Sequence, residues 1–280
     1  MFTTPPILFC HIPKTGGSSI RELITKNYWP WERSEIYRME RRSFQEEWEK
    51  KYATDWGRRR LSRVRIFFGH TAMRLRDTLP PGLRCFTFLR APLARVVSLF
   101  HYARDANRDA GALGRILQEE DWTLERIYNE GPTALHRDFV RYGPMRQFFN
   151  GQARSLLVGY NDPQHFPSEP RHPLLRDRQR QAAALLDEFE FVGRQEKFAE
   201  DLRSLAQIFG WSLPFTPRKN VATQPAIAED LDFELRQLIL AHNEVDQALV
   251  ASAEATHQAR ESHSSKDGRR PPAIPSRGEL

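Results

Sequence analysis

Four short apolar segments, separated by helical stretches, constrain the fold of this 280-residue chain more than any other feature. They are residues 7–12 (ILFCHI), 65–70 (RIFFGH), 85–90 (CFTFLR) and 189–194 (FEFVGR). Nearly continuous apolar character over so few residues is typical of strands that are buried on both faces. Because these strands alternate with helices, the sequence predicts an α/β fold with a central, mainly parallel sheet.

Helical patterns fill most of the remaining chain. We expect mainly helical structure over 113–150, with breaks near Gly131-Pro132 and Gly143-Pro144, and surface helix and loop over 29–63. The length suits one sizeable core, so we expect a single domain over 1–256 and a disordered polar tail over 257–280. Further helices are expected over 16–28, 92–105, 174–188, 197–211 and 226–255, with loops over 159–173 and 212–224.

Charge and cysteine content narrow the class of protein only partly. The formal net charge of +6 and the pI near 9.5 favour anionic partners such as nucleotides, nucleic acid, acidic glycans or a membrane surface. Cys10 and Cys85 lie in predicted strands without metal-ligand spacing, which favours packed thiols in a reducing compartment, with a disulfide as the alternative. Since the chain shows neither a signal peptide nor an apolar run of about 18 residues, we expect a cytoplasmic protein without a membrane span, unless a leader or anchor has been removed.

The first strand is followed by a segment with the chemistry of an anion site. It reads Lys14-Thr15-Gly16-Gly17-Ser18-Ser19 and leads into a helix. Glycines let the backbone approach a ligand closely, and the N–H groups and dipole at a helix start attract negative charge. A Walker loop has its lysine after the glycines, whereas here the lysine precedes them. The sequence therefore predicts an anion site outside the Walker class, and the alternative is a serine-capped glycine turn with Lys14 in solvent.

Two other predicted strands end in residues that suit the same site. His70 follows the second strand, and Arg90 ends the third. An arginine at a strand end offers a planar fork for phosphate oxygens, and a histidine titrates near neutral pH. Because ligands of parallel sheets bind at the carboxyl ends of strands, we expect these residues to lie beside the loop that begins at Lys14.

In combination these motifs resemble those of the sulfotransferases that use 3′-phosphoadenosine 5′-phosphosulfate (PAPS) as donor. HIPKTGGSS resembles their 5′-phosphosulfate loop, most of all in the carbohydrate branch with the heparan and dermatan sulfate 2-O-sulfotransferases and many bacterial relatives. CFTFLRAPLARVVSLFHY resembles their second motif, although Ala91 replaces the usual acidic or amide residue. FEFVGRQEKFAEDL and the RKN at 218–220 resemble later segments more weakly. The resemblance covers roughly residues 5–255 and implies a P-loop-like three-layer fold with helical additions.

The resemblance also implies roles for individual residues. Backbone amides of the loop and the ammonium group of Lys14 would hold the 5′-phosphosulfate, and Arg90 with Ser98 would hold the 3′-phosphate. His70 would be the base that accepts the proton of the acceptor hydroxyl; His11, His101 and His136 are weaker candidates. No metal is expected. The implied donor-binding residues are Lys14, Thr15, Gly16, Gly17, Ser18, Ser19, Arg90, Ser98, Arg218 and Lys219.

The predicted function is sulfuryl transfer from PAPS to a hydroxyl group, with a carbohydrate as the expected acceptor and no nucleic-acid partner. Trp29, Trp31, Trp48 and Trp56 could stack on sugar rings or pack together in a lid. One alternative is a nucleotide-dependent phosphotransferase, which would need a Walker lysine and a magnesium-binding carboxylate at a strand end. A second is a nucleic-acid-binding protein with steep salt dependence. A third is a relative that binds nucleotide without chemistry.

Overall fold

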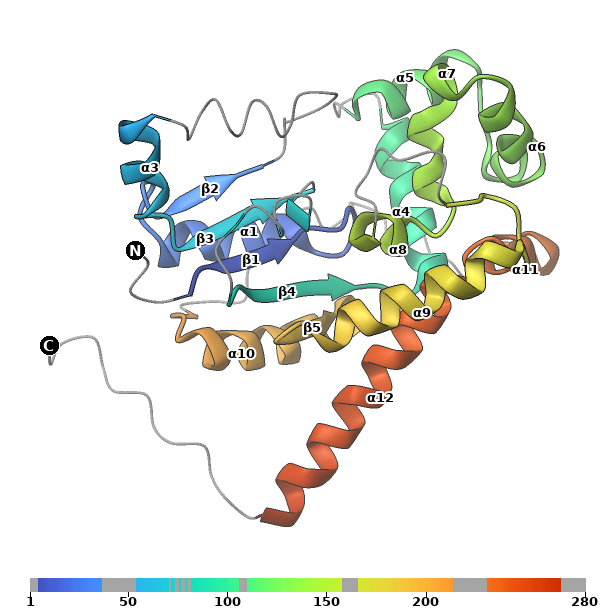
Figure 1. Ribbon diagram of the computed structural model, residues 1–280. Coiled ribbons are helices and arrows are strands. Elements are labelled where there is room, and N and C mark those ends of the chain that lie inside the picture. Colours follow the sequence, from blue (N-terminus) through green and yellow to red (C-terminus); the bar gives the residue numbers. More distant parts are fainter. Residues whose placement is uncertain are drawn as a thin grey trace, which may run out of the picture.

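The computed structural model of the chain describes residues 5–36, 54–70, 72–73, 76, 79, 82–105, 110–157, 166–213 and 231–267. Within these residues, parallel strands form a five-stranded sheet in the order β2-β3-β1-β4-β5 (Figure 1). The predicted α/β fold with a mainly parallel sheet is confirmed, and all four expected strands are present. The fifth strand, β2, lies where surface helix and loop were expected. The strands are β1 (Ile7–Cys10), β2 (Arg33–Glu35), β3 (Ile66–Gly69), β4 (Arg84–Leu89) and β5 (Phe191–Arg194).

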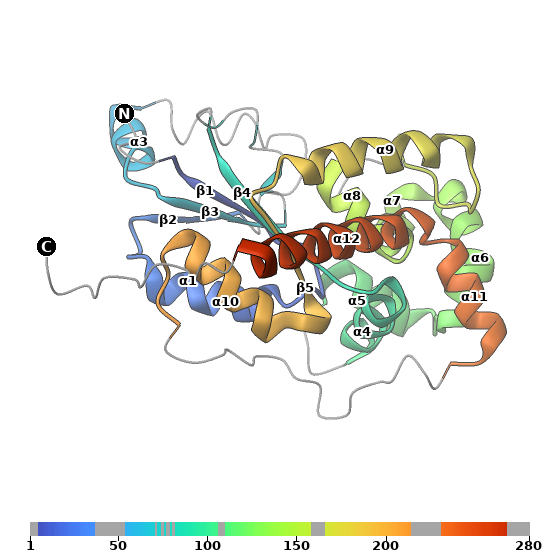
Figure 2. The ribbon, with the colours of Figure 1, turned by 90° about the horizontal axis from the view of Figure 1, so that it is seen from below.

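Side chains on the two faces of the sheet build two separate cores, because successive strand residues point to opposite faces. Ile7 and Phe9 of β1 pack in the core that includes helices α1 (Gly17–Asn27) and α10 (Phe198–Phe209). Leu8 and Cys10 point the other way, into the core with α8, α9 and α12. Sheet and helices thus form three layers (Figure 2). The second set of helices is α8 (Gly151–Leu157), α9 (Pro173–Asp187) and α12 (Glu244–Asp267).

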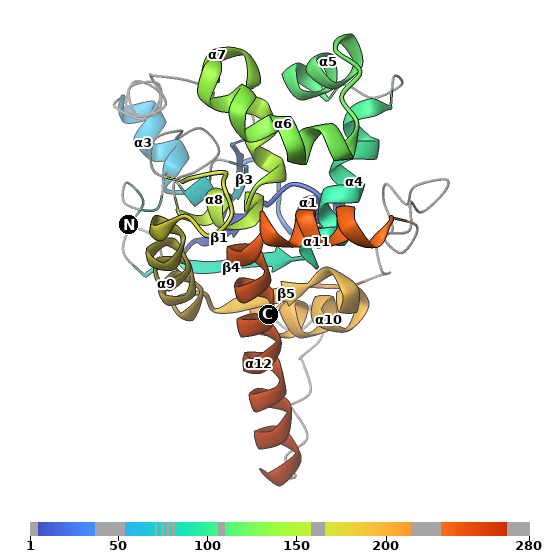
Figure 3. The same ribbon diagram turned by 90° about the vertical axis from the view of Figure 1, so that its right-hand side faces the viewer.

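A further group of helices has its own core beside the sheet, in the upper part of Figure 3. The predicted break near Gly131-Pro132 is wrong, because α6 continues through Pro132 and keeps Ile127, Tyr128 and Leu135 buried. That burial outweighs the unfavourable proline. The predicted break at Gly143 is confirmed, since α7 ends one residue before it. The group comprises α4 (Pro92–Arg104), α5 (Gly111–Glu119), α6 (Leu124–Arg137), α7 (Phe139–Tyr142), η2 (Gly143–Phe148) and α11 (Phe233–Ala241).

The C-terminal region differs from the single helix expected over 226–255. Two helices, α11 and α12, meet at Asn243, whose side-chain amide donates to the carbonyl groups of Phe148 and Ile239. Helix α12 runs on to Asp267, so the expected domain boundary at residue 256 falls inside it. Residues 268–280 of the expected tail lie outside the described residues. The smaller elements are α3 (Asp55–Leu61) and η3 (Gln195–Lys197). Each helix in the described part of the chain is too short or too polar to span a lipid bilayer.

Both cysteines are buried free thiols on neighbouring strands, as the interpretation of packed thiols predicted. Burial raises the pKa of Cys85 to about 11 and raises that of Cys10 as well. Their role is therefore to fill the core.

Candidate functional site

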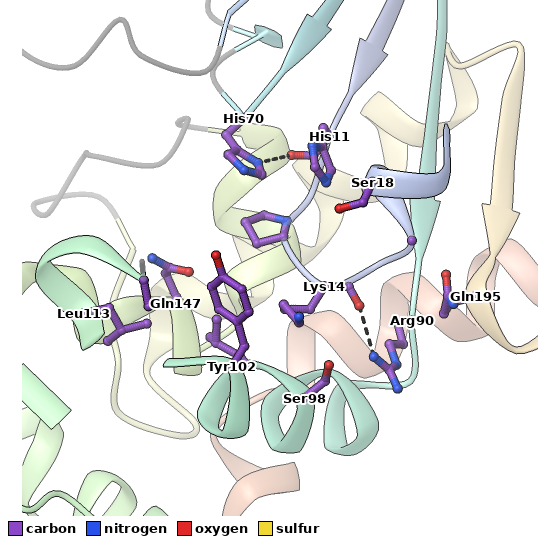
Figure 4. Close-up of a pocket in the computed structure, with 15 residues that line it drawn as sticks. His11, Lys14, Ser18, His70, Arg90, Ser98, Tyr102, Leu113, Gln147 and Gln195 are labelled. Carbon is purple, nitrogen blue, oxygen red and sulfur yellow. Dashed lines mark hydrogen bonds between the residues drawn. The ribbon is translucent and has the colours of Figure 1, made fainter. Parts of the chain in front are cut away.

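The order of the strands brings four chemically distinct segments side by side at the carboxyl edge of the sheet. Along β3-β1-β4-β5 these are His70, the loop that begins at His11, Arg90 and Gln195. A cavity of about 310 Å³ lies at this edge (Figure 4). Of the predicted site residues, it is lined by Lys14, Gly16, Gly17, Ser18, His70, Arg90 and Ser98, with the weaker candidate His11. The expectation that the three strand ends converge is therefore met.

The loop after β1 has a backbone that depends on its glycines. Gly16 has a φ of 90° and forms the N-cap of α1. A Cβ atom at Gly16 would lie 2.2 Å from Oε1 of Gln195, and one at Gly17 would lie 1.7 Å from Nε2 of His11. Helix α1 has no acidic residue in its first turn, so nothing there offsets the positive end of its dipole. The start of α1 at the cavity therefore suits an anion.

Two arginines hold the carbonyl groups of this loop. Nη1 of Arg90 donates to the carbonyl oxygen of Lys14 at 3.2 Å, and Nε of Arg95 donates to that of Pro13, also at 3.2 Å. Arg95 is fully buried and donates from Nη1 to the carbonyl of Gln147 at 2.9 Å. Burial lowers the pKa of Arg90, which means that its charge is poorly solvated and would be stabilised by an anion in the cavity.

Thr15 and Ser19 of the predicted set contribute in a different way. Both side chains are buried, and the Thr15 hydroxyl donates to the carbonyl of Ile12 at 2.9 Å. The backbone amide of Ser19 donates to the carbonyl of Gly16. These contacts hold the turn together.

Lys14 lies in the middle of the cavity. Its Nζ sits 4.3 Å from the centre of the Tyr102 ring, which is within range of a cation–π interaction. Tyr102 and Ser98 are four residues apart on α4, and both line the cavity (Figure 4). Sequence reasoning missed Tyr102, although its spacing from Ser98 places the two on one helix face. The ammonium group of Lys14 and the Tyr102 ring are therefore neighbours in the wall of the cavity.

A hydrogen bond to the main chain fixes the tautomer of His70. Its Nδ1 lies 2.8 Å from the carbonyl oxygen of His11, and since a carbonyl can only accept, Nδ1 carries the proton. In the neutral ring, Nε2 is then the basic nitrogen. Burial lowers the pKa of both His70 and His11, whose rings lie 4.3 Å apart. His70 is therefore neutral at neutral pH and can accept a proton.

The other candidates lie elsewhere. His101 and His136 are exposed, and His136 pairs with Glu169. Trp29 and Trp31 stack on each other with 62% and 54% of their surfaces exposed. They precede β2, whose first residue pairs with the first residue of β3, so they lie at the amino edge of the sheet, away from the cavity. The described residues do not include Trp48, Arg218, Lys219 or the side chain of Trp56.

Several cavity residues had no signature in the sequence. Gln195 follows β5, and its buried Oε1 has no hydrogen-bond partner within the described part of the chain. Gln147 lines the cavity from η2, and Leu113 lines it from α5. Across the described ranges, no group of three or more His, Cys, Asp or Glu side chains could hold a metal ion.

A parallel sheet that carries a glycine-rich turn, a helix N-terminus and cations at its carboxyl edge is typical of α/β proteins that bind anionic groups. The chain belongs to the sulfotransferase family, whose sequence model matches residues 1–224. Among solved structures, a sulfotransferase from Alicyclobacillus acidocaldarius is similar at 16% identity over 91% of this chain and 97% of that chain, with a TM-score of 0.41. No curated protein matches this chain significantly.

Proposed function

We propose that this chain transfers the sulfuryl group of PAPS to a hydroxyl group of a carbohydrate. One observation carries the proposal: a single cavity gathers Lys14, Arg90, Ser98 and His70 from the ends of three neighbouring strands and the helix that follows one of them. These groups include two cations and a neutral histidine, which suit a donor with two anionic groups and a hydroxyl acceptor. Membership of the sulfotransferase family supports sulfuryl transfer as the reaction.

The donor would be held at two places. The start of α1, with Ser18 and the ammonium group of Lys14, would bind the 5′-phosphosulfate. The guanidinium of Arg90 and the hydroxyl of Ser98, on the following helix, would bind the 3′-phosphate. Because ADP and ATP lack a 3′-phosphate, this second contact would select the donor. Arg218 and Lys219 are proposed to add to the 3′-phosphate or adenine side.

His70 would start the reaction by accepting the proton of the acceptor hydroxyl on Nε2. The hydroxyl oxygen then bonds to sulfur while the bond between sulfur and the bridging oxygen breaks, and the electron pair stays on the departing phosphate. Lys14 would stabilise the charge that develops on that oxygen. The products are the sulfated acceptor, adenosine 3′,5′-bisphosphate and a proton carried by His70.

The acceptor side of the cavity is proposed from two observations. The sequence HIPKTGGSS resembles the loop of the carbohydrate sulfotransferases. Tyr102, Leu113 and Gln147 lie on the side of Lys14 that faces away from Arg90 and Gln195 (Figure 4). An aromatic ring and an apolar side chain beside a carboxamide suit a sugar ring, which has apolar faces and hydroxyl edges.

Calorimetric titration tests the donor assignment. Adenosine 3′,5′-bisphosphate, ADP and ATP are titrated into the parent protein, Arg90→Ala and the control Arg104→Ala. Arg104 lies at the end of α4, the helix that follows Arg90, and pairs with Asp121 instead of lining the cavity. We expect the parent and the control to bind the bisphosphate more tightly than ADP or ATP. In Arg90→Ala, the ratio of these affinities should fall at least about tenfold. Equal binding of ADP by the parent would contradict the 3′-phosphate assignment.

Sulfuryl transfer itself is measured with radiolabelled PAPS against a panel of glycans, lipids and phenols. Labelled product from a glycan supports the carbohydrate assignment, and product from phenols alone refutes it. With the best acceptor, we expect His70→Ala to lower kcat by about 10²–10⁴-fold, the usual contribution of a general base. The exposed histidine His101 gives the matched control, and a near-parent rate in His70→Ala would remove His70 as the base.

A further inference from the structure

Both main-chain groups of Arg90 are bonded to one buried side chain that no motif singled out. The amide of Gln152 donates to the carbonyl oxygen of Arg90 at 2.8 Å, and its Oε1 accepts the backbone N–H of Arg90 at 2.9 Å. Gln152 is 0% exposed. Just where β4 ends, the carboxamide of Gln152 therefore makes the main-chain hydrogen bonds that a neighbouring strand would otherwise make. These bonds hold the peptide groups on either side of the Cα atom of Arg90.

The residue after Arg90 is held by a side chain from another element. The backbone N–H of Ala91 donates to Oε1 of Glu196 at 2.9 Å, and Glu196 follows β5. This contact satisfies the backbone N–H of Ala91, the N-cap residue of α4, whose own side chain makes no capping hydrogen bond. The two contacts therefore fix main-chain groups of two successive residues, Arg90 and Ala91, between β4 and α4.

Gln152 is in turn held by the C-terminal helix. The backbone N–H groups of Gln152 and Ala153 donate to the two carboxylate oxygens of Asp246, at 3.0 and 2.8 Å. In return, Oδ1 of Asn150 accepts the backbone N–H groups of Val245 and Asp246, at 2.9 and 3.2 Å. Helices α8 and α12 therefore cap each other's N-termini. Asp246 is 0% exposed, so water cannot replace these bonds.

Asp246 lies beyond residues 1–224, the part of the chain that the family model matches. The contacts from Asp246 through Gln152 to Arg90 are hydrogen bonds between main-chain groups and side chains; those at Asp246 are buried and those at Arg90 are partly buried. A loss at either side chain must therefore move a main chain or leave a buried polar group unsatisfied.

We propose that Gln152, seated by Asp246 of helix α12, is a positioning residue that places Arg90 for recognition of the 3′-phosphate. This inference rests on the proposed function. Arg90 also donates to the carbonyl of Lys14, so a shift of its backbone changes its reach to both the loop and the ligand. Since small displacements of a binding group are costly, the effect falls on affinity for the 3′-phosphate.

The test compares adenosine 3′,5′-bisphosphate with AMP, which lacks the 3′-phosphate. Affinities for both are measured by calorimetry on the parent, Gln152→Met, Gln152→Glu and Asp246→Asn. Methionine keeps the size of glutamine without its hydrogen bonds, and glutamate keeps only the acceptor. We expect the ratio of bisphosphate to AMP affinity to fall at least about tenfold in Gln152→Met and by less in Asp246→Asn.

Val245→Ala is the matched control. Val245 is fully buried at the start of α12. Its aliphatic side chain packs in the core and takes no part in the hydrogen bonds that lead to Arg90. It should lower the melting temperature but leave the affinity ratio at the parent value. If Gln152→Met does not fold, the near-isosteric Gln152→Glu and Asp246→Asn carry the test.

The possible failures can be told apart. If the parent binds the two nucleotides equally, the proposed function is wrong. If the parent prefers the bisphosphate and Arg90→Ala loses this preference while the folded Gln152 and Asp246 variants keep it, only the positioning role is refuted. A ratio that falls equally in Val245→Ala also refutes it, since any loss of core packing would then have the same effect.

Discussion

Acidification should destabilise this protein through His11, a histidine that the fold keeps neutral. The ring is buried, lies 4.3 Å from the ring of His70 and fills the space that a side chain at Gly17 would need. Burial, assisted by repulsion between the protonated forms of His11 and His70 and by the positive charges of Arg21 and Lys14, lowers the pKa of His11 well below 6.5. The unfolded chain therefore binds more protons than the folded chain below pH 6.5.

The size of the effect follows from proton linkage. A histidine that stays neutral when folded and has an unfolded pKa near 6.5 contributes stability that is fully present above pH 6.5 and is lost as the pH falls below it. At about pH 5.5 the loss is about 1.4 kcal/mol, whereas at about pH 7.5 it is under about 0.1 kcal/mol. Burial lowers the pKa of His70 and His242 too, so the total loss is larger.

Urea unfolding at the two pH values isolates the contribution of His11. The free energy of unfolding of the parent should fall by about 1.4 kcal/mol more than that of His11→Gln, because glutamine does not titrate. His101→Gln changes an exposed histidine on α4, and its free energy of unfolding should fall as much as that of the parent. Equal losses in the parent and in His11→Gln would show that folded His11 protonates freely, and the reasoning from burial would be refuted.

Three further perturbations test the loop, the sheet edge and the core. Gly17→Ala puts a Cβ atom 1.7 Å from Nε2 of His11, so binding of adenosine 3′,5′-bisphosphate should weaken at least about tenfold in calorimetry, and parent-like affinity would contradict the steric argument. Asp201→Asn breaks a buried ion pair with Arg194, whose Nη2 lies 2.7 Å from the carboxylate. Urea unfolding should therefore show that the free energy of unfolding falls by about 3–5 kcal/mol. A fall under about 1 kcal/mol would refute the importance of this ion pair. Cys85, with a pKa raised to about 11, should react with a thiol reagent at neutral pH only after denaturation, and rapid labelling of the native protein would contradict its burial.

Much of the fold could be predicted because four of the five strands have a short apolar sequence pattern of their own. β1, β3, β4 and β5 are short and apolar, and each was expected within two residues of its observed ends. β2 was missed, since Arg33, Ser34 and Glu35 have no apolar pattern and form a strand only by pairing with β3 at the sheet edge. Pro132 likewise predicted a helix break that does not occur, because the helix around it buries an apolar face.

The site was predictable where a motif marks a strand end, and hidden where a residue arrives from a distant helix. Lys14, His70 and Arg90 each follow an apolar strand, so parallel pairing alone brings them together. Gln147 and Gln152 reach the same edge from η2 and α8, and their positions depend on how the helical group packs. Glutamine is common at surfaces, so nothing in the sequence distinguishes these two from exposed ones.

Lys14, which precedes the glycines of this loop, has an unusual backbone conformation that the surrounding fold supports. Lys14 has a φ of 71°, in the left-handed region that costs a residue with a side chain about 1–2 kcal/mol. Arg90 offsets part of this cost by donating to the carbonyl of Lys14, while Arg95 does the same for Pro13. The guanidinium proposed to bind the 3′-phosphate thus also fixes the turn proposed to bind the 5′-phosphosulfate. The two ends of the proposed donor site are therefore coupled through Arg90, and we expect a change at Arg90 to weaken binding of AMP as well as of the bisphosphate, but of the bisphosphate more.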